Sequence, residues 1–133
     1  MADAKTPKTI LIIDDASLVR LYYKSALRAA GFRVEEALNG IEAIEKLLEM
    51  PAPVDLLIVD INMPQMDGVT FLGLLRQKHL PLAAIPALVT STEAGENDFA
   101  AARTAGANYF LVKPVSPEAL VEHARLLCGI RHE

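Results

Sequence analysis

The 133-residue sequence contains a single cysteine, no long apolar run and no excess of basic residues. Cys128 has no second thiol with which to form a disulfide, which is typical of a protein from a reducing compartment. A membrane-spanning helix needs roughly twenty consecutive apolar residues, and no segment approaches that length, so we expect a cytoplasmic protein. Because 13 basic residues stand against 17 acidic ones, the net charge is −4 at pH 7. The basic surface expected of a nucleic-acid-binding protein is therefore missing.

What is present is typical of one compact domain. Apolar residues make up 52% of the chain and charged residues 23%, with seven glycines and eight prolines, which argues against disorder. A chain of this length buries a single sizeable core. We expect one domain over residues 9–128, short tails at 1–8 and 129–133, and no output domain.

Five short apolar runs predict β-strands. They are Thr9–Ile13, Arg33–Ala37, Leu56–Val59, Ala87–Thr90 and Tyr109–Val112. None of them alternates cleanly between apolar and polar residues. Continuous apolar runs are typical of parallel strands that are covered on both faces.

The segments between these runs carry helix signals. The expected helices are Ser17–Ala30 ended by Gly31, one capped by Asn39 with Glu42 three residues on, one from the cap Asp67 to Lys78, Gly95–Ala105, and one opened by Ser116 and Pro117. Strand and helix thus alternate five times without a linker. This order predicts a single doubly wound α/β domain with a parallel sheet and right-handed crossovers.

Polar residues stand at the ends of four predicted strands. They are Asp14 and Asp15 after the first strand, Asp60 after the third, Thr90 and Ser91 at the end of the fourth, and Lys113 after the fifth. Because the carboxyl ends of parallel strands share one edge of the sheet, we expect these side chains to converge. An alternative role for Asp14 or Asp15 is to cap the first helix, although two adjacent acids exceed what one cap requires.

This set of side chains indicates a particular chemistry. Three carboxylates packed together repel one another unless a cation joins them, and Mg²⁺ prefers oxygen ligands. The lysine indicates that an anionic ligand binds beside the cation. A phosphoryl group fits both, with one aspartate as its nucleophile.

Four segments, IIDDAS, LIVDINMPQMDG, PALVTST and AGANYFLVKP, together resemble the receiver domains of bacterial two-component response regulators, in particular free-standing, CheY-like ones. The resemblance covers roughly Thr9 to Leu127. It implies a flavodoxin-like (βα)5 three-layer sandwich whose five-stranded parallel sheet has the order 2-1-3-4-5.

The resemblance also implies roles for individual residues. Asp60 becomes the phosphoacceptor, and Mg²⁺ is held by Asp15, Asp60 and the backbone carbonyl of Asn62, with Asp14 acting through water. Lys113 pairs with the phosphoryl oxygens, and the Lys113–Pro114 bond is often cis in this family.

Two further positions resemble the family's switch residues. The switch hydroxyl falls on Ser91 by spacing, with Thr90 as the alternative. The next residue, Thr92, is bulkier than is common in the family and is expected to narrow access to Asp60. The aromatic switch falls on Phe110 instead of Tyr109, so it carries no hydroxyl.

The implied function is that of a single-domain response regulator, with no enzyme activity beyond self-catalysed phosphoryl transfer and slow autodephosphorylation. A histidine kinase or histidine phosphotransfer protein donates the phosphoryl group, and the face built by the fourth helix, fifth strand and fifth helix contacts a downstream protein. The LVRLYY stretch, including Leu18 and Leu21, is expected to dock the donor. The protein is expected to be a monomer or weak dimer, and chemotaxis, phosphorelay and phosphate-sink roles all remain open.

Two rival functions remain. A phosphatase resembling the haloacid dehalogenase family needs an acid two residues after its nucleophile, where this chain has Asn62. The second rival is a docking module that has the same fold but works without phosphorylation. It does not explain why all three aspartates, Asp14, Asp15 and Asp60, are present.

Overall fold

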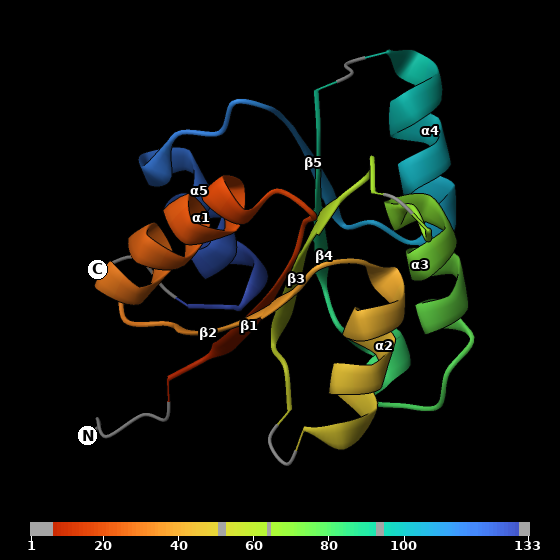
Figure 1. The fold of residues 1–133 in the computed structure, drawn as a ribbon, viewed down its shortest axis with the longest axis horizontal. Helices are drawn as coiled ribbons and strands as arrows, with labels where there is room; N and C mark the ends of the chain where they lie inside the picture. The colour runs from red at the N-terminus through yellow and green to blue at the C-terminus, as the bar shows by residue number, and fades with distance from the viewer. Residues whose placement is uncertain (1–6, 51–52, 64, 93–94, 131–133) are drawn as a thin grey trace.

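The computed structural model describes residues 7–50, 53–63, 65–92 and 95–130, and its centre is a parallel five-stranded sheet in the order β2-β1-β3-β4-β5 (Figure 1). The strands are β1 (Thr9–Ile13), β2 (Arg33–Ala37), β3 (Leu56–Asp60), β4 (Ala87–Ser91) and β5 (Tyr109–Val112). The helices are α1 (Ser17–Ala29), α2 (Gly40–Glu49), α3 (Gly68–Arg76), α4 (Glu96–Ala105) and α5 (Pro117–Leu127), with a short 3₁₀ helix at Leu82–Ala84. The predicted fold class and strand order are therefore confirmed.

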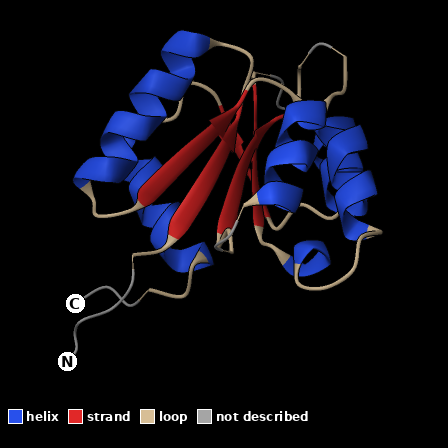
Figure 2. Cartoon of the chain, turned by 60° about the horizontal axis from the view of Figure 1, so that its bottom comes forward, coloured by secondary structure: helices blue, strands red, loops and turns tan. Residues whose placement is uncertain are grey.

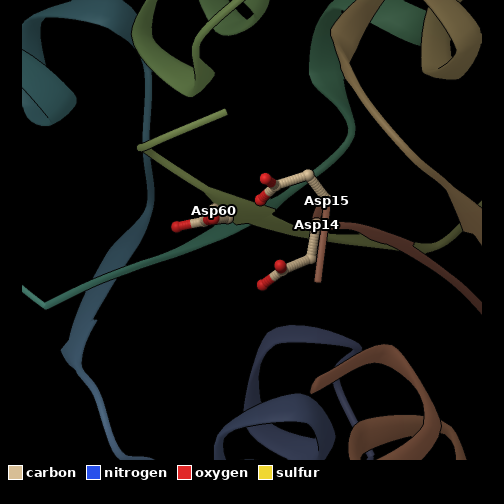
Figure 3. A group of neighbouring side chains, drawn as sticks. All are labelled: Asp14, Asp15 and Asp60. Atoms are coloured by element: carbon tan, nitrogen blue, oxygen red, sulfur yellow. The ribbon is translucent and has the colours of Figure 1, made fainter. Parts of the chain in front are cut away.

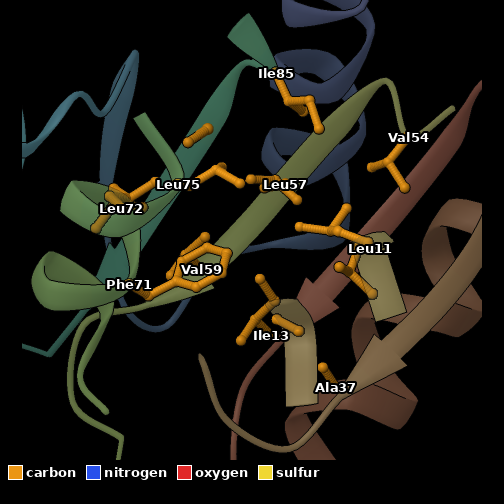
Figure 4. Packing of buried hydrophobic residues seen from close by; sticks show 14 of the residues in the cluster. Leu11, Ile13, Ala37, Val54, Leu57, Val59, Phe71, Leu72, Leu75 and Ile85 are labelled. Carbon is orange, nitrogen blue, oxygen red and sulfur yellow. The ribbon is translucent and has the colours of Figure 1, made fainter. Parts of the chain in front are cut away.

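The helices form two layers that cover both faces of the sheet. Helices α1 and α5 lie on one face, and α2, α3 and α4 lie on the other (Figures 1 and 2). Strand β1 contributes to the core on both faces of the sheet. Its Ile10 and Ile12 pack toward α1 and α5, whereas Leu11 and Ile13 pack toward the other helix layer. Figure 4 shows the second of these clusters, in which Phe71 of α3 packs beside Val59 of β3. Burial on both faces explains why the strands read as continuous apolar runs.

Three predicted helix caps are confirmed. Asn39 Oδ1 accepts from the Glu42 N–H at 2.9 Å, Asp67 Oδ1 from the Thr70 N–H at 2.8 Å, and Ser116 Oγ from the Ala119 N–H at 3.1 Å. The Glu42 carboxylate accepts from the N–H of Leu38, one residue before the cap, so the motif at Asn39 differs from a reciprocal capping box. Gly31 has a φ of 97°, as expected after the first helix.

Several predicted boundaries were wrong by one or two residues. Strands β3 and β4 each continue one residue further, to Asp60 and Ser91, because Asp60 pairs with Thr90 and Ser91 pairs with Val112 of β5. The helix ends differ by as little: α1 ends at Ala29, α3 ends at Arg76 instead of Lys78, and α4 begins at Glu96 after the N-cap Gly95.

Arg76 ties the end of α3 to the end of α4. Its guanidinium donates to the Gly106 carbonyl at 2.6 and 3.1 Å and to the carbonyls of Ile85 at 2.7 Å and Ala83 at 3.2 Å. It also reaches Asn108 Oδ1, at 3.2 Å. Gly106 ends α4 with a φ of 108°, and a Cβ there would lie 2.6 Å from Arg76 Nε. Both the left-handed conformation and the close guanidinium therefore require glycine at this position.

The predicted tails fall largely outside the described residues, since 1–6 and 131–133 are not described; the same holds for Pro64 of the LIVDINMPQMDG segment. Over the part of the chain that is described, no helix is long and apolar enough to cross a membrane.

Candidate functional site

Three aspartates meet at the carboxyl edge of the sheet. Asp14 and Asp15 follow β1, and Asp60 is the last residue of β3. One carboxylate oxygen from each lies within 4.8 Å of those of the other two, and Figure 3 shows the three side chains around one small space. Asp14 is 1% exposed and Asp60 5%, whereas Asp15 is open to solvent. A group of carboxylates that is buried on one side and open on the other fits a hard cation such as Mg²⁺, which takes oxygen ligands and keeps some water.

Hydrogen bonds fix the Asp14 side chain in this site. Its Oδ1 accepts from the Ala16 N–H at 2.9 Å, and its Oδ2 accepts from Lys113 Nζ at 3.0 Å. The Arg20 guanidinium donates to the Asp14 carbonyl at 2.7 Å. Helix α1 begins after Ala16 without a side-chain cap, so the alternative role of Asp14 or Asp15 as a helix cap is wrong.

Lys113 joins two of the three carboxylates. Its Nζ lies 3.0 Å from Asp14 Oδ2 and 3.4 Å from Asp60 Oδ1, and its side chain is 16% exposed. Burial lowers the pKa of Lys113, but the hydrogen bond to Asp14 and the charges of Asp14 and Asp60 outweigh burial and hold the pKa above its usual value. The lysine is therefore a fixed cation directly beside Asp60.

Asp60 is an unfavourably placed carboxylate. Burial raises its pKa and the charge of Asp14 raises it further, while Lys113 and the backbone N–H of Asn62 oppose these effects only in part. The Asn62 N–H donates to Asp60 Oδ1 at 3.3 Å. One lysine does not compensate the local negative charge, which leaves the site suited to an additional cation.

The loop after β3 returns tightly to the strand end. The Gly68 N–H donates to the Ile61 carbonyl at 2.9 Å, and a Cβ on Gly68 would lie 2.6 Å from the Asp60 carbonyl oxygen. Glycine is therefore needed where α3 starts beside Asp60. The sequence analysis missed this role, although the Asp-Gly pair that ends LIVDINMPQMDG was its signal.

Both candidate switch hydroxyls are buried at the end of β4. Ser91 pairs with Val112, the last residue of β5, and its carbonyl accepts from the N–H of the next residue, Lys113, at 2.7 Å. Thr90 is fully buried, and its hydroxyl lies beside the Tyr23 phenol. Ser91 thus keeps the switch role as a prediction, with Thr90 as its alternative.

Tyr23, the last residue of the LVRLYY stretch, lies next to the site. It is buried, and burial raises the pKa of its phenol; the Lys113 charge lowers this pKa and the Asp14 charge raises it. The phenol therefore belongs to the electrostatic surroundings of the Lys113–Asp14 pair. A tyrosine on the buried stripe of a helix that follows two acids was the available signal.

The two aromatic residues of β5 face different helices. Phe110 packs against Phe99 of α4 with ring centroids 4.3 Å apart at 63°. Tyr109 is exposed and stacks on His123 of α5 at 4.7 Å. Phe110 thus contacts the helix layer that includes α4, where an aromatic switch is expected, and Phe99 is a contact that the sequence did not indicate.

An apolar cavity of about 570 Å³ adjoins the site. Its walls come from one side of α1, from residues 113–115 and from Thr92. At its mouth, Leu18 is 78% exposed and Tyr22 47%. Lys113 contributes to both the cavity wall and the aspartate group, so the cavity lies beside the site.

Cys128 is not a candidate nucleophile. It lies half-buried at the end of α5, and burial raises the pKa of its thiol to about 11. The reactive thiolate is therefore a minor form at neutral pH.

Comparisons with known proteins agree with this geometry. A family model described as the response regulator receiver domain matches residues 10–125. The chain is 36% identical over 121 residues to the chemotaxis protein CheY1 of Helicobacter pylori (strain J99 / ATCC 700824), which covers 90% of this chain and 96% of that protein. It is equally identical over 115 residues to the sensor histidine kinase CheAY of Helicobacter pylori (strain ATCC 700392 / 26695), which covers 84% of this chain and 14% of the kinase.

Solved structures show the same fold. A structure of the Vibrio cholerae chemotaxis protein CheY4 matches with a TM-score of 0.84 and 30% identity, over 92% of this chain and 99% of that one. A putative response regulator from Chloroflexus aurantiacus matches with a TM-score of 0.85 and 34% identity, over 93% and 99% of the two chains.

Proposed function

Because this chain belongs to the receiver domain family of response regulators, we propose that Asp60 accepts a phosphoryl group from a histidine kinase or a histidine phosphotransfer protein. Receiver domains are signalling proteins and not conventional enzymes. The observation that carries the proposal is the position of Asp60, which lies in a group of three aspartates and 3.4 Å from Lys113.

Each residue of the site has a chemical task in this proposal. An Asp60 carboxylate oxygen attacks phosphorus, and the bond from phosphorus to the donor's nitrogen breaks. Asp15, Asp60 and the Asn62 carbonyl, with Asp14 acting through water, would hold Mg²⁺, which would supply positive charge beside the phosphoryl oxygens. Lys113 binds another phosphoryl oxygen, and its bond to Asp14 holds its ammonium in place before the donor arrives.

Phosphorylation of Asp60 is proposed to change the positions of β4, β5 and α4. A phosphoryl group on Asp60 attracts the Ser91 hydroxyl and draws β4 toward the site, and Phe110 moves inward with it. Phe110 packs on Phe99, so its movement is passed to α4. The α4-β5-α5 face is then reshaped for a downstream protein.

The donor is proposed to dock at α1. Leu18 and Leu21 are 78% and 56% exposed on α1, and Leu18 also lines the cavity beside Lys113. A charge at either position should slow phosphotransfer from a protein donor and leave phosphorylation by acetyl phosphate intact. Equal loss of both would indicate misfolding. The CheY1 and CheY4 relatives are chemotaxis proteins, which favours chemotaxis among the three open pathways.

The two rival functions make different demands on the site. Asn62 is an amide at the position where a haloacid dehalogenase-like phosphatase needs an acid, so turnover of a phosphate monoester is not expected. A docking module that works without phosphorylation does not explain why the Asp60 carboxylate is buried beside Lys113.

Intact-protein mass spectrometry tests the proposal. The protein is incubated with acetyl phosphate and Mg²⁺, beside an Asp60→Asn variant and a sample with EDTA. One labile phosphoryl adduct, absent from both controls, is expected. A folded protein that binds Mg²⁺ and forms no adduct would favour the docking module.

A further inference from the structure

The cavity beside Lys113 is larger and more apolar than phosphoryl transfer alone requires. Its volume is about 570 Å³, and its walls include Leu18, Val19 and Tyr22 of α1 and Val115 after β5. Lys113 and Thr92 also belong to the wall. An occupant therefore meets mostly hydrocarbon, with one cationic side chain in the lining.

The charge distribution limits the chemistry of that occupant. A molecule whose anionic group reaches Lys113 places that group next to Asp60, because Lys113 Nζ is 3.4 Å from Asp60 Oδ1. Its remaining part must be apolar to gain from the cavity walls. A phosphodonor with an apolar leaving group has both properties.

The residues near Asp60 limit the type of leaving group. Asn62, two residues after Asp60, has no acidic proton to give to a departing oxygen. An alkoxide leaving group needs such a proton, whereas a carboxylate leaves as a stable anion without one. Besides the imidazole of a phosphohistidine, the leaving group that suits this site is thus the carboxylate of a mixed anhydride of a carboxylic and a phosphoric acid.

We propose that the cavity receives the acyl chain of an acyl phosphate, so that this protein is phosphorylated faster by donors with extended apolar acyl groups than by acetyl phosphate. This inference rests on the proposed role of Asp60. In the reaction, an Asp60 carboxylate oxygen forms a bond to phosphorus. The bond from phosphorus to the acyl oxygen breaks, and the carboxylate departs with the electron pair. No proton, oxidant or further reactant is required.

The expected preference follows from the area that the chain buries. Each methylene moved from water into an apolar site increases binding about fourfold. Butyryl phosphate has two methylenes more than acetyl phosphate, and the two leaving carboxylates are of nearly equal basicity. We therefore expect butyryl phosphate to phosphorylate Asp60 about five to fifteen times faster at equal, subsaturating concentration.

The test measures the initial rate of adduct formation by intact-protein mass spectrometry with acetyl phosphate or butyryl phosphate, both with Mg²⁺. A double variant, Leu18→Ser with Tyr22→Ser, shortens two exposed side chains of the cavity wall. A matched double variant, Ile41→Ser with Leu48→Ser, makes similar changes at exposed positions of α2, on the other face of the sheet. The cavity variant should lose most of the butyryl preference and keep its acetyl phosphate rate, and the α2 variant should keep both.

The outcomes separate this inference from the proposed function. Equal rates with the two donors in the unmodified protein overturn the acyl-chain site and leave Asp60 as the phosphoacceptor; this is also the result expected if the cavity serves only a side chain of a protein donor. A butyryl preference that survives in the cavity variant also overturns it. No adduct from either donor overturns the proposed function, and the acyl-chain site with it.

Discussion

Replacing Asp60 by asparagine is expected to stabilise the folded protein when no divalent cation is present. Burial and the charge of Asp14 raise the pKa of Asp60, so the ionised carboxylate is less favourable in the folded chain than in the unfolded one. Asparagine has nearly the same shape and can still accept the hydrogen bond from the Asn62 N–H. The substitution therefore removes the charge and little else.

The magnitude follows from the distances in the site. The three carboxylate oxygens lie within 4.8 Å of one another, so at an effective dielectric constant of about 20 the Asp60 charge is repelled by Asp14 by about 3.5 kcal/mol or somewhat more. The repulsion from Asp15 is smaller, because Asp15 is exposed and water screens it. Lys113, at 3.4 Å, attracts the same charge by about 5 kcal/mol. Repulsion and attraction nearly cancel, and desolvation of the carboxylate is left uncompensated. We expect Asp60→Asn to raise the free energy of unfolding by about 1–2 kcal/mol.

Urea denaturation in EDTA measures this difference. Asp55→Asn serves as the matched control, because Asp55 Oδ2 accepts from the Thr9 N–H at 2.8 Å far from the site, and weakening that bond should cost up to about 1 kcal/mol. Adding Mg²⁺ should stabilise the unmodified protein more than Asp60→Asn, so the gap between them narrows. If Asp60→Asn is destabilised in EDTA as much as Asp55→Asn, attraction by Lys113 dominates and the reasoning is refuted.

Three other predictions concern single positions. Gly68→Ala should destabilise the fold by about 2 kcal/mol, since its Cβ would lie 2.6 Å from the Asp60 carbonyl oxygen. Gly73→Ala, whose Cβ would meet nothing within 4 Å, should stabilise α3 by about 0.5–1 kcal/mol. Thermal unfolding of both variants checks this, and equal effects would contradict it. Glu36→Gln should lower the free energy of unfolding by less than about 1 kcal/mol at pH 7. Because Lys24 and Arg20 lower the pKa of Glu36, this difference should be present at neutral pH and vanish as the pH falls and Glu36 protonates. Urea titrations across the acid range measure it, and a difference that persists at low pH would refute the reasoning. Gln65→Gly should stabilise the protein by about 0.5–1 kcal/mol, because Gln65 has a φ of 70°; a lower melting temperature would show that its contact with Asn39 matters more.

The fold was predictable because its signals are local. Apolar runs of four or five residues, separated by helices with recognisable caps, fix a parallel α/β sheet once chain connectivity is considered. The strand ends were less predictable. Asp60 is a poor strand former, so the predicted strand stopped at Val59, yet pairing with Thr90 extends β3 to Asp60.

The convergence of Asp14, Asp15 and Asp60 was also predictable, because a parallel sheet places these residues on one edge. The surroundings of the site were not. Tyr23 beside Lys113, and Phe99 against Phe110, depend on how helices pack on the sheet, and no spacing in the sequence encodes those contacts. The same holds for Arg76, whose guanidinium reaches Gly106, thirty residues along the chain.

The attachment of Arg76 has a consequence for how α4 can move. Its guanidinium holds the carboxyl end of the helix at Gly106 and bonds in the same cluster to the carbonyls of Ala83 and Ile85. Phe99 lies near the opposite end, one turn from the start at Glu96. A displacement of Phe110 therefore acts near the amino end of α4, while the carboxyl end is held at Gly106. The helix should tilt about Gly106 instead of sliding along its axis. Side chains near its amino end should then move furthest.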